Sequence, residues 1–175
     1  MERIIDIFTD GAVSGNPGPG GAAAIVNDYI NNIGISIGTF EKETTNQRME
    51  LKGILIGLYQ ILDDHAVLWH NNNLIAVNIF SDSAYCVRAF NEGWLNKWQA
   101  NGWKNSKKEP VANQDLWKKI LDAIKDCNEN NIKVNFFKVK GHSDIEYNNM
   151  ADEVAVYCSR RQTNYSSIRK LGDSK

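Results

Sequence analysis

The sequence predicts an α/β domain in which a mixed sheet of about five strands is flanked by helices. Three strand-like segments with short connections come first, and strands then alternate with helical segments, an order typical of an antiparallel meander followed by parallel strands. With 175 residues, 42% hydrophobic and 23% charged, the chain suits one soluble globular domain. A chain of this length buries about 70% of its unfolded surface, so it needs no disulfide or metal to fold.

The first three strands are expected over residues 3–9, 22–26 and 33–40. Residues 3–9 are rich in isoleucine and end at Asp10-Gly11, and a polar turn separates the other two segments. The stretch 14–21 consists largely of Gly, Pro, Ser and Asn, which favours turns over helix or strand. The connections are short, and we therefore expect an antiparallel meander.

The hydrophobic period then changes, and apolar residues at helical spacing predict an amphipathic helix over about 46–63. Gly53 and Gly57, four residues apart, would let this helix lie close to the sheet at a cost in helix propensity. A fourth strand is predicted over 74–81, ending at Asp82, and short helices over 83–92 and 95–100.

The last elements are a helix that Asn113 caps, a strand over 132–139 and a helix over about 148–159. After Ser159 the apolar content is low. We therefore expect one folded domain over residues 1–159 and a flexible basic tail over 160–175.

Composition excludes several classes of protein. The net charge of −1 rules out a uniformly basic nucleic-acid coat, so a polyanion partner must meet a local patch. Apolar runs are far shorter than the roughly 20 residues that span a membrane, and the strand-like start leaves no room for a signal peptide. Cys86, Cys127 and Cys158 are odd in number and widely spaced, which predicts buried free thiols in a reduced compartment, with the cytoplasm as the expected location.

Four carboxylates occupy unusual positions. Asp10 and Asp82 end the first and fourth strands, and strand ends are where α/β folds place functional groups. Glu50 lies at the edge of the apolar face of the first helix, and Asp152 lies in the first turns of the last helix. If the two strands are neighbours, Asp10 and Asp82 converge, and a helix packed across the sheet brings in Glu50. Carboxylates this close repel one another unless a hard divalent cation such as Mg²⁺ binds. The alternative is that each acid caps a turn or helix, but their shared context favours a joint site.

His142 lies in a polar loop between the last strand and the last helix, ten positions before Asp152. A mobile histidine beside a metal site can move protons or help a product leave. His65 and His70 lie in a polar connection and are expected to be solvated bystanders.

Short motifs follow one another in an order that matches a known family. They are Thr9-Asp10-Gly11, Gly15-Asn16-Pro17-Gly18, residues 44–51 (TTNQRMEL), Ser81-Asp82-Ser83 with Tyr85, Trp94, Trp98, Gly102-Trp103-Lys104, Pro110-Val111, Asn113, Asp115-Leu116-Trp117, residues 139–143 (VKGHS), Asn148 and Ala151-Asp152. On these motifs the chain resembles bacterial-type ribonuclease HI from about residue 4 to residue 158. A lone Thr-Asp-Gly is a weak signal, whereas this ordered set carries all four carboxylates.

The resemblance implies the ribonuclease H-like fold and an endonuclease that cuts the RNA strand of RNA–DNA hybrids, leaving 5′-phosphate and 3′-hydroxyl ends. The residues that would hold two Mg²⁺ ions, with Mn²⁺ as a possible substitute, are Asp10, Glu50, Asp82 and Asp152. His142 matches the auxiliary histidine of the family. Two-metal hydrolysis needs no covalent nucleophile, which agrees with the lack of a plausible Ser–His or Cys–His pair.

The resemblance also implies the substrate contacts. Residues that would read the 2′-hydroxyl of the RNA strand are Gly11, Asn16, Asn46 and Gln47, whose types are small or able to donate and accept hydrogen bonds. The DNA strand would meet Trp94 and Trp98, together with a phosphate pocket that includes Thr45 and Asn113. The two tryptophans share one helix face; the alternative is that they are core residues, as we expect for Trp69, Trp103 and Trp117.

Two departures from the family pattern stand out. The spacing from Asp82 to Trp94 is one residue longer than in the best-known members, and Asp144 stands where many members have glycine. Two other functions remain open on this fold: a catalytically silent nucleic-acid-binding module and an integrase-like DNA-processing enzyme. The four acids argue against the first, and the lack of room for extra DNA-binding and multimerisation segments argues against the second. The sequence gives no clear oligomerisation surface, so a monomer is the default expectation.

The charge is unevenly distributed. Residues 94–119 hold six lysines and two acids, a net of +4, and residues 160–175 also carry +4, which leaves −9 for the rest. A basic segment of this kind predicts phosphate contacts that weaken with salt.

Overall fold

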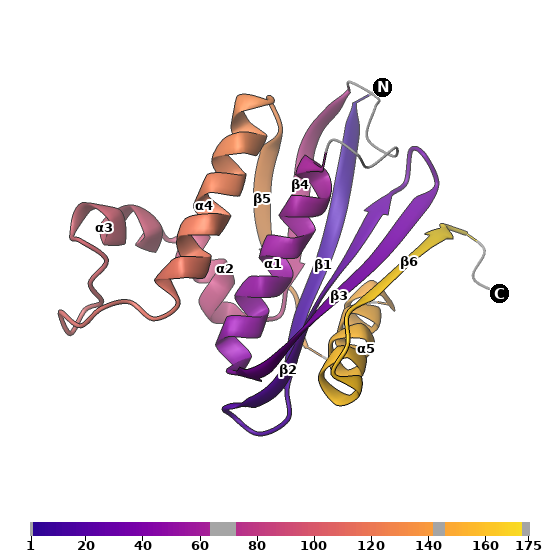
Figure 1. Cartoon of the computed structure of the whole chain (residues 1–175). Helices are drawn as coiled ribbons and strands as arrows, with labels where there is room; N and C mark the ends of the chain where they lie inside the picture. The colour runs from indigo at the N-terminus through magenta and orange to yellow at the C-terminus, as the bar shows by residue number, and fades with distance from the viewer. Residues whose placement is uncertain (1, 64–72, 142–145, 173–175) are drawn as a thin grey trace.

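A computed structural model of the chain describes residues 2–63, 73–141 and 146–172 (Figure 1). In this part of the chain the strands form one six-stranded sheet with the order β5-β4-β1-β2-β3-β6. The strands are β1 (Arg3–Val13), β2 (Gly18–Asp28), β3 (Ile33–Thr44), β4 (Leu74–Ser81), β5 (Lys133–Lys138) and β6 (Tyr165–Lys170). The helices are α1 (Asn46–Leu62), α2 (Ala84–Asn91), α3 (Trp94–Ala100), α4 (Gln114–Glu129) and α5 (Glu146–Arg161).

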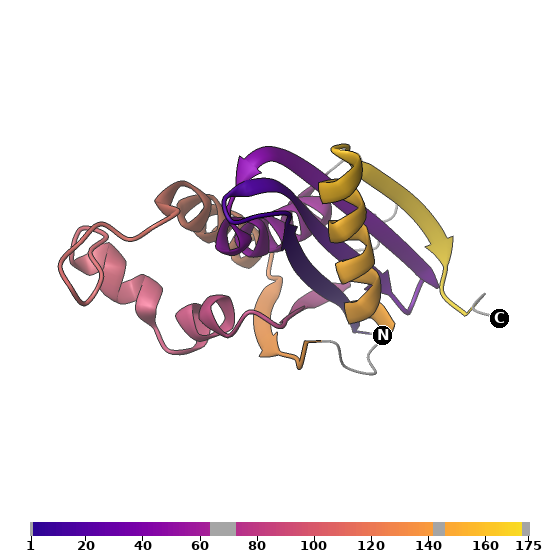
Figure 2. The ribbon, with the colours of Figure 1, turned by 90° about the horizontal axis from the view of Figure 1, so that it is seen from below.

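The sheet is mixed, as the sequence predicts. β1, β2 and β3 form the expected antiparallel meander, and β1, β4 and β5 run parallel. α1 and α4 cover one face and α5 covers the other, while α3 and the segment that follows it project beyond the β5 side (Figures 1 and 2). The five expected strands are present, and β6 is an addition.

α1 lies very close to the sheet, and two glycines make this approach possible. A Cβ atom on Gly53 would stand 2.9 Å from the carbonyl oxygen of Ala23 and 3.1 Å from that of Asp10. One turn later, a Cβ on Gly57 would stand 2.8 Å from Cγ2 of Ile7. The predicted close packing of this helix is confirmed.

β2 begins earlier than predicted. The stretch 14–21 is a turn only up to Pro17, because β2 starts at Gly18 and its pairing with β3 shifts register between Gly18 and Gly20. A Cβ on Gly21 would stand 2.1 Å from the carbonyl oxygen of Ala155 in α5. The small residue at position 21 lets α5 pack closely on the sheet. The local turn pattern gives no sign of this packing.

The expected tail over residues 160–175 is a second correction. α5 continues to Arg161, and Tyr165–Lys170 forms β6, which pairs antiparallel with β3. Burial alternates along β6, but the exposed positions include Ile168, so the strand offers little apolar signal. Backbone hydrogen bonds to the edge of β3 hold it in place, and these bonds leave no trace in composition. Residues 173–175 lie outside the described part of the chain.

Asn113 stands at the predicted start of α4, but its side chain makes no capping hydrogen bond there. Its backbone is left-handed (φ 57°), and its carbonyl accepts from the N–H groups of Leu116 and Trp117. The side-chain oxygen instead faces α1, where it accepts from Nη1 of Arg48 at 3.5 Å. Thr45 does cap α1, since its hydroxyl accepts from the Arg48 N–H at 3.3 Å.

The cysteines follow the prediction. Cys86, Cys127 and Cys158 are buried and free. Burial raises the pKa of the Cys86 thiol to about 12 and those of the other two to about 11. In the described residues, no helix combines the length and apolar character that crossing a bilayer requires.

Candidate active site

Two neighbouring parallel strands bring the first two carboxylates together. Thr9 of β1 pairs with Ser81 of β4, so the next residues, Asp10 and Asp82, lie side by side. Asp82 follows the end of β4, whereas Asp10 does not end its strand as expected, because β1 continues to Val13 and Asp10 pairs with Ala23 of β2. Glu50 arrives from the second turn of α1. One carboxylate oxygen from each of these three residues lies within 4.8 Å of the others, and the predicted convergence is confirmed.

The carboxylates line a cavity of about 180 Å³ at this end of the sheet. Its lining is polar and comes from β1, α1, the end of β4 and α5: Asp10, Gly11, Asn46, Glu50, Asp82, Asn148, Asn149 and Asp152. Asp152 therefore reaches the same cavity from α5, although the 4.8 Å cluster consists of the other three acids.

Burial makes the cluster electrostatically costly. Burial, followed by the charges of Asp82 and Asp152, raises the pKa of Asp10 to about 7, against a hydrogen bond from the Gly11 N–H at 2.7 Å. Burial and the charges of Asp10 and Asp82 hold the pKa of Glu50 well above its ordinary range. Oε2 of Glu50 is buried and has no hydrogen-bond partner among the described residues. Three converging carboxylates, one of them with an oxygen that lacks a hydrogen-bond partner, form the kind of oxygen ligand set that a hard divalent cation binds.

Two glycines make room for the cluster. A Cβ on Gly11 would stand 2.6 Å from the backbone nitrogen of Glu50, so only glycine lets α1 come this close to β1. After β5, a Cβ on Gly141 would stand 2.7 Å from Oδ2 of Asp82. The sequence pattern includes both glycines, but only the packing shows why they are needed.

Two of the residues expected to read the RNA strand line the cavity, and a third contacts one of them. Gly11 and Asn46 line it, and the side-chain oxygen of Asn16 accepts from the backbone N–H of Asn46 at 3.3 Å. Gln47 follows on α1 and is half-buried. The turn after β1 and the start of α1 thus form one surface next to the carboxylates.

The two tryptophans differ in their surroundings. Trp98 is 8% exposed and packs edge-on against Trp117, so the core interpretation applies to most of its ring. Trp94 is half-buried, packs against Tyr85, and donates from Nε1 to Glu92 at 3.1 Å. Both line a groove of about 720 Å³, whose basic residues are Lys97 and Lys104.

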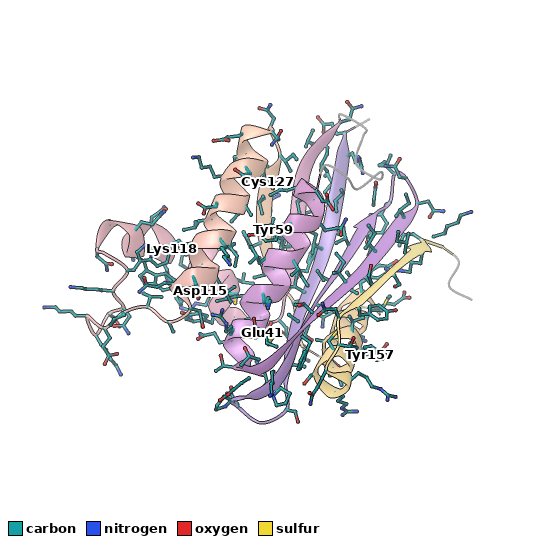
Figure 3. All side chains as sticks on the ribbon, in the orientation of Figure 1. Glu41, Tyr59, Asp115, Lys118, Cys127 and Tyr157 are labelled. Atoms are coloured by element: carbon teal, nitrogen blue, oxygen red, sulfur yellow. The ribbon has the colours of Figure 1, made fainter. Side chains whose placement is uncertain are left out.

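Trp117 is fully buried, and Trp103 is partly buried against the core. Nζ of Lys118 lies 5.1 Å from the centre of the Trp103 ring, and Figure 3 shows this lysine on the side of α4 that faces the projecting segment. Trp69 lies outside the described residues.

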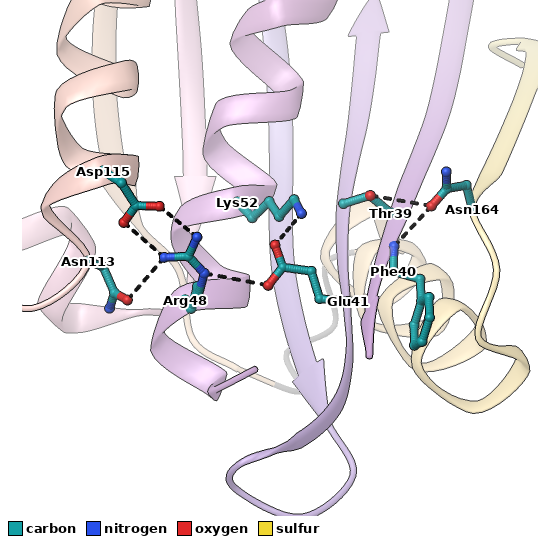
Figure 4. Close-up of polar contacts among 8 residues, drawn as sticks. All are labelled: Thr39, Phe40, Glu41, Arg48, Lys52, Asn113, Asp115 and Asn164. Carbon is teal, nitrogen blue, oxygen red and sulfur yellow. Dashed lines mark hydrogen bonds and ion pairs between the residues drawn. The ribbon is translucent and has the colours of Figure 1, made fainter. Parts of the chain in front are cut away.

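Arg48 is a residue to which the sequence analysis assigns no role, and it lies between residues expected in the phosphate pocket. Its guanidinium binds Asp115 with two hydrogen bonds, of 2.9 and 2.6 Å, and Nε lies 3.5 Å from Oε2 of Glu41 (Figure 4). Nη1 of Arg48 also donates to Asn113, and the backbone N–H of Arg48 donates to the hydroxyl of Thr45. Arg48 therefore connects the two residues expected in the phosphate pocket. Its hydrogen bonds lower the pKa of Asp115. An arginine three residues after a helix cap was the available signal.

Asn148 is a second residue to which the sequence analysis assigns no role. It is 2% exposed, lines the cavity, and its Oδ1 has no hydrogen-bond partner among the described residues. It stands four residues before Asp152, so the two share one face of α5, a relation that the sequence contains.

His142 and Asp144 fall outside the described residues, as do His65 and His70. Gly141, the last described residue before this gap, lies next to Asp82.

Comparison with known proteins places these features in a family. The family model for RNase H matches residues 2–160. The chain is 46% identical over 160 residues to a ribonuclease H of Thermoanaerobacter sp. strain X514, covering 91% of this chain and 92% of that protein. It is 48% identical over 154 residues to a ribonuclease H of Caldanaerobacter subterraneus subsp. tengcongensis, covering 88% and 90%.

Solved structures agree at the level of the fold. LC9-RNase H1, described as a type 1 RNase H with the type 2 active-site motif, superposes with a TM-score of 0.75 at 24% identity, over 98% of this chain and 79% of that one. LC11-RNase H1 in complex with an RNA/DNA hybrid gives 0.64 at 23% identity, over 90% and 98%. The sequence match runs through every element that contributes to the carboxylate cavity, and the chain belongs to the ribonuclease H family.

Proposed function

We propose that this chain is an endoribonuclease that hydrolyses the RNA strand of RNA–DNA hybrids. The observation that carries the proposal is the convergence of Asp10, Glu50 and Asp82 within 4.8 Å, in a cavity that Asp152 also lines. Relatives at 46–48% identity are ribonucleases H, and a more distant relative of the same fold has been solved with an RNA/DNA hybrid.

We propose that the acidic cluster holds two Mg²⁺ ions, with Mn²⁺ as a possible substitute. Asp10, Glu50, Asp82 and Asp152 would hold them, and the unpartnered Oε2 of Glu50 supports this assignment. Bound ions would supply an activated water and stabilise the leaving oxygen, giving 5′-phosphate and 3′-hydroxyl ends. The protein supplies carboxylates whose positions the sheet and two helices hold.

A covalent route has no support in the described residues. Cys86, the cysteine nearest in sequence to the acids, is fully buried, and burial raises the pKa of its thiol to about 12. A thiol with this pKa is protonated at neutral pH and is a poor nucleophile.

Substrate selection would follow the surface around the cavity. Gly11, Asn16, Asn46 and Gln47 would read the 2′-hydroxyl of the RNA strand. Asn16 and Asn46 are exposed, and their hydrogen bond holds the turn after β1 against α1. That arrangement gives the amides a defined position next to the carboxylates.

The DNA strand would lie over the α1–α4 junction and the tryptophan groove. Thr45, Arg48 and Asn113 meet at this junction and offer a hydroxyl, a guanidinium and an amide to a phosphate. Trp94 would stack against a sugar or base, while Trp98 would supply an edge of the groove from the core.

The test uses labelled hybrid, duplex RNA and duplex DNA. The wild type should cut only the RNA strand of the hybrid, and only when Mg²⁺ or its substitute Mn²⁺ is present; EDTA or Asp10→Asn should stop the reaction. Equal cutting of duplex RNA, or activity that survives chelation, would sink the proposal. Cutting of duplex DNA would favour the integrase-like alternative instead.

A second variant separates catalysis from binding. Asp82→Asn should abolish cleavage while the hybrid still binds, because Asp82 faces the cavity and the tryptophan groove is formed by other residues. Thermal unfolding serves as the folding control. A wild type that binds hybrid without cutting it under any divalent metal would instead be the silent binding module.

His142 is proposed as the auxiliary residue on the family's pattern. His142→Ala should slow turnover without eliminating it, and a rate equal to that of the wild type would make it a bystander. We also propose a monomer in the cytoplasm, a location with which the three buried free thiols agree.

A further inference from the structure

β6 lies beyond the region that the family model matches, yet one of its side chains reaches far into the molecule. Arg169 pairs with Gly34 of β3, and Gly34 pairs in turn with Asn27 of β2. A Cβ on Gly34 would stand 2.7 Å from the guanidinium carbon of Arg169. The missing side chain at Gly34 therefore lets Arg169 cross β3 on the face that α5 covers.

The guanidinium is held by two strands. Nη1 donates to the hydroxyl of Ser36 at 3.0 Å, and Nη2 donates to the side-chain oxygen of Asn27 at 2.8 Å. Ser36 and Asn27 are buried, at 3% and 0% exposure. A planar guanidinium fixed at two nitrogens has little freedom, and a single ammonium could not reproduce both bonds.

The same guanidinium contacts the first turn of α5. Its central carbon lies 5.5 Å from the centre of the Tyr147 ring, within the range of a cation–π interaction. The Tyr147 ring lies 5.5 Å from the ring of Phe8, which stands two residues before Asp10 on β1. Figure 2 shows that β6 returns to the end of the molecule at which α5 begins.

The two ends of α5 are therefore held by different contacts. Its C-terminal half packs against Gly21, and the hydroxyl of Ser159 donates to the carbonyl of Pro19 at 2.8 Å. Its first turn, next to Asn148 and five residues before Asp152, contacts Arg169 and Phe8 through Tyr147.

We propose that Arg169 of β6 is a positioning residue for the active site: through Tyr147 it fixes the start of α5, and so the place of Asp152 and Asn148 in the carboxylate cavity. The inference rests on the proposed function for its link to catalysis. Arg169 is not a catalytic residue, because it lines no part of that cavity.

The test compares Arg169→Met with Lys170→Met, the next residue on the same strand and an exposed one. Mg²⁺ binding to the free protein is measured by calorimetry, and kcat and KM for the hybrid are measured over a range of Mg²⁺ concentrations. Arg169→Met should weaken Mg²⁺ binding about tenfold, the lower end for residues that orient metal ligands. Its KM for the hybrid should stay unchanged, and high Mg²⁺ should restore its kcat. Arg169→Lys should bind Mg²⁺ more weakly than the wild type but more tightly than Arg169→Met. Lys170→Met should match the wild type.

A merely structural role predicts another result, namely a smaller active fraction at every Mg²⁺ concentration with unchanged Mg²⁺ affinity. That result, or wild-type Mg²⁺ binding by Arg169→Met, would overturn the proposal. If Arg169→Met does not fold, Tyr147→Leu and Tyr147→Phe decide: phenylalanine keeps the ring and should bind Mg²⁺ normally, whereas leucine should weaken binding. Equal Mg²⁺ binding by both would also overturn it. Should the wild type bind Mg²⁺ without cutting hybrid, the proposed function fails while the calorimetric comparison still tests Arg169.

Discussion

At the scale of single residues, Asp10 shows how a metal site opposes folding. Its pKa rises from 3.8 to about 7, mainly through burial and then through the charge of Asp82. A group whose pKa is higher in the folded state binds its proton more tightly there. Its contribution to stability is therefore complete below about pH 4 and is lost as the pH rises through about 7. Without metal, the protein carries this cost at neutral and alkaline pH.

Asp10→Asn should therefore stabilise the metal-free protein at pH 8 and have little effect at pH 4, since the amide has the size of the acid and no charge. Thermal unfolding in EDTA at both pH values measures this, with Asp122→Asn, an exposed change on α4, as the control. Added Mg²⁺ should raise the melting temperature of the wild type more than that of the variant. A variant no more stable than the wild type at pH 8 would show that the buried carboxylate carries no such cost.

At the scale of elements, the position of α1 depends on the absence of side chains at its two glycines. Gly53 faces the carbonyl oxygens of Ala23 and Asp10, whereas Gly57 faces the side chain of Ile7. Glycine costs the helix about 1 kcal/mol in propensity per position relative to alanine. Close packing of α1 on the sheet offsets this cost, and the same close approach brings Glu50 to Asp10.

Gly53→Ala and Gly57→Ala should both destabilise the protein by about 1–3 kcal/mol, since overpacking outweighs the gain in helix propensity. Only Gly53→Ala should also weaken Mg²⁺ binding, because its new methyl group presses on the Asp10 backbone. Urea unfolding and calorimetry with Mg²⁺ measure the two effects. Stabilisation by either change would contradict the packing argument, and an equal loss of Mg²⁺ affinity in both would remove the special role of Gly53.

At the scale of the whole molecule, a net charge of −1 conceals a separation of charge. The basic segment 94–119, with a net of +4, includes α3 and the part of the chain that projects beyond the sheet (Figure 1). The carboxylate cavity is lined by residues of β1, α1 and α5 and by Asp82, and none of them lines the tryptophan groove, so the two regions are distinct. A hybrid can be attracted by the first before its phosphates meet the second.

Hybrid binding should weaken with salt, and the groove lysines should account for part of the dependence. With Asp82→Asn as a non-cleaving background, replacing Lys97 and Lys104 by alanine should reduce the slope of log K against log salt by about 1 for each lost phosphate contact. Lys125→Ala, whose lysine pairs with Glu129 on α4, is the control. An unchanged slope in the double variant would show that residues other than these two lysines make the phosphate contacts.

What the sequence determined by itself is the order of elements, the four candidate acids, the close helix at Gly53 and Gly57, and the free thiols. Each of these features follows from short-range patterns in the sequence, namely hydrophobic period, turn residues, and acids at the ends of apolar runs. Such signals act over one or two turns or one strand, which is why the boundaries of β4 and α1 were predicted to within a residue.

The tertiary structure decided what depends on residues distant in the chain. β6 pairs with the edge of β3, and the side chain of Asn113 contacts Arg48 of α1 instead of capping α4. Trp98 joins the core while Trp94, one turn earlier on the same helix, stays half-buried. The raised pKa of Asp10 likewise comes from burial and from neighbours 72 and 142 positions away. Burial, edge pairing and charge coupling are properties of space rather than of sequence spacing, so they became visible only once the chain was folded.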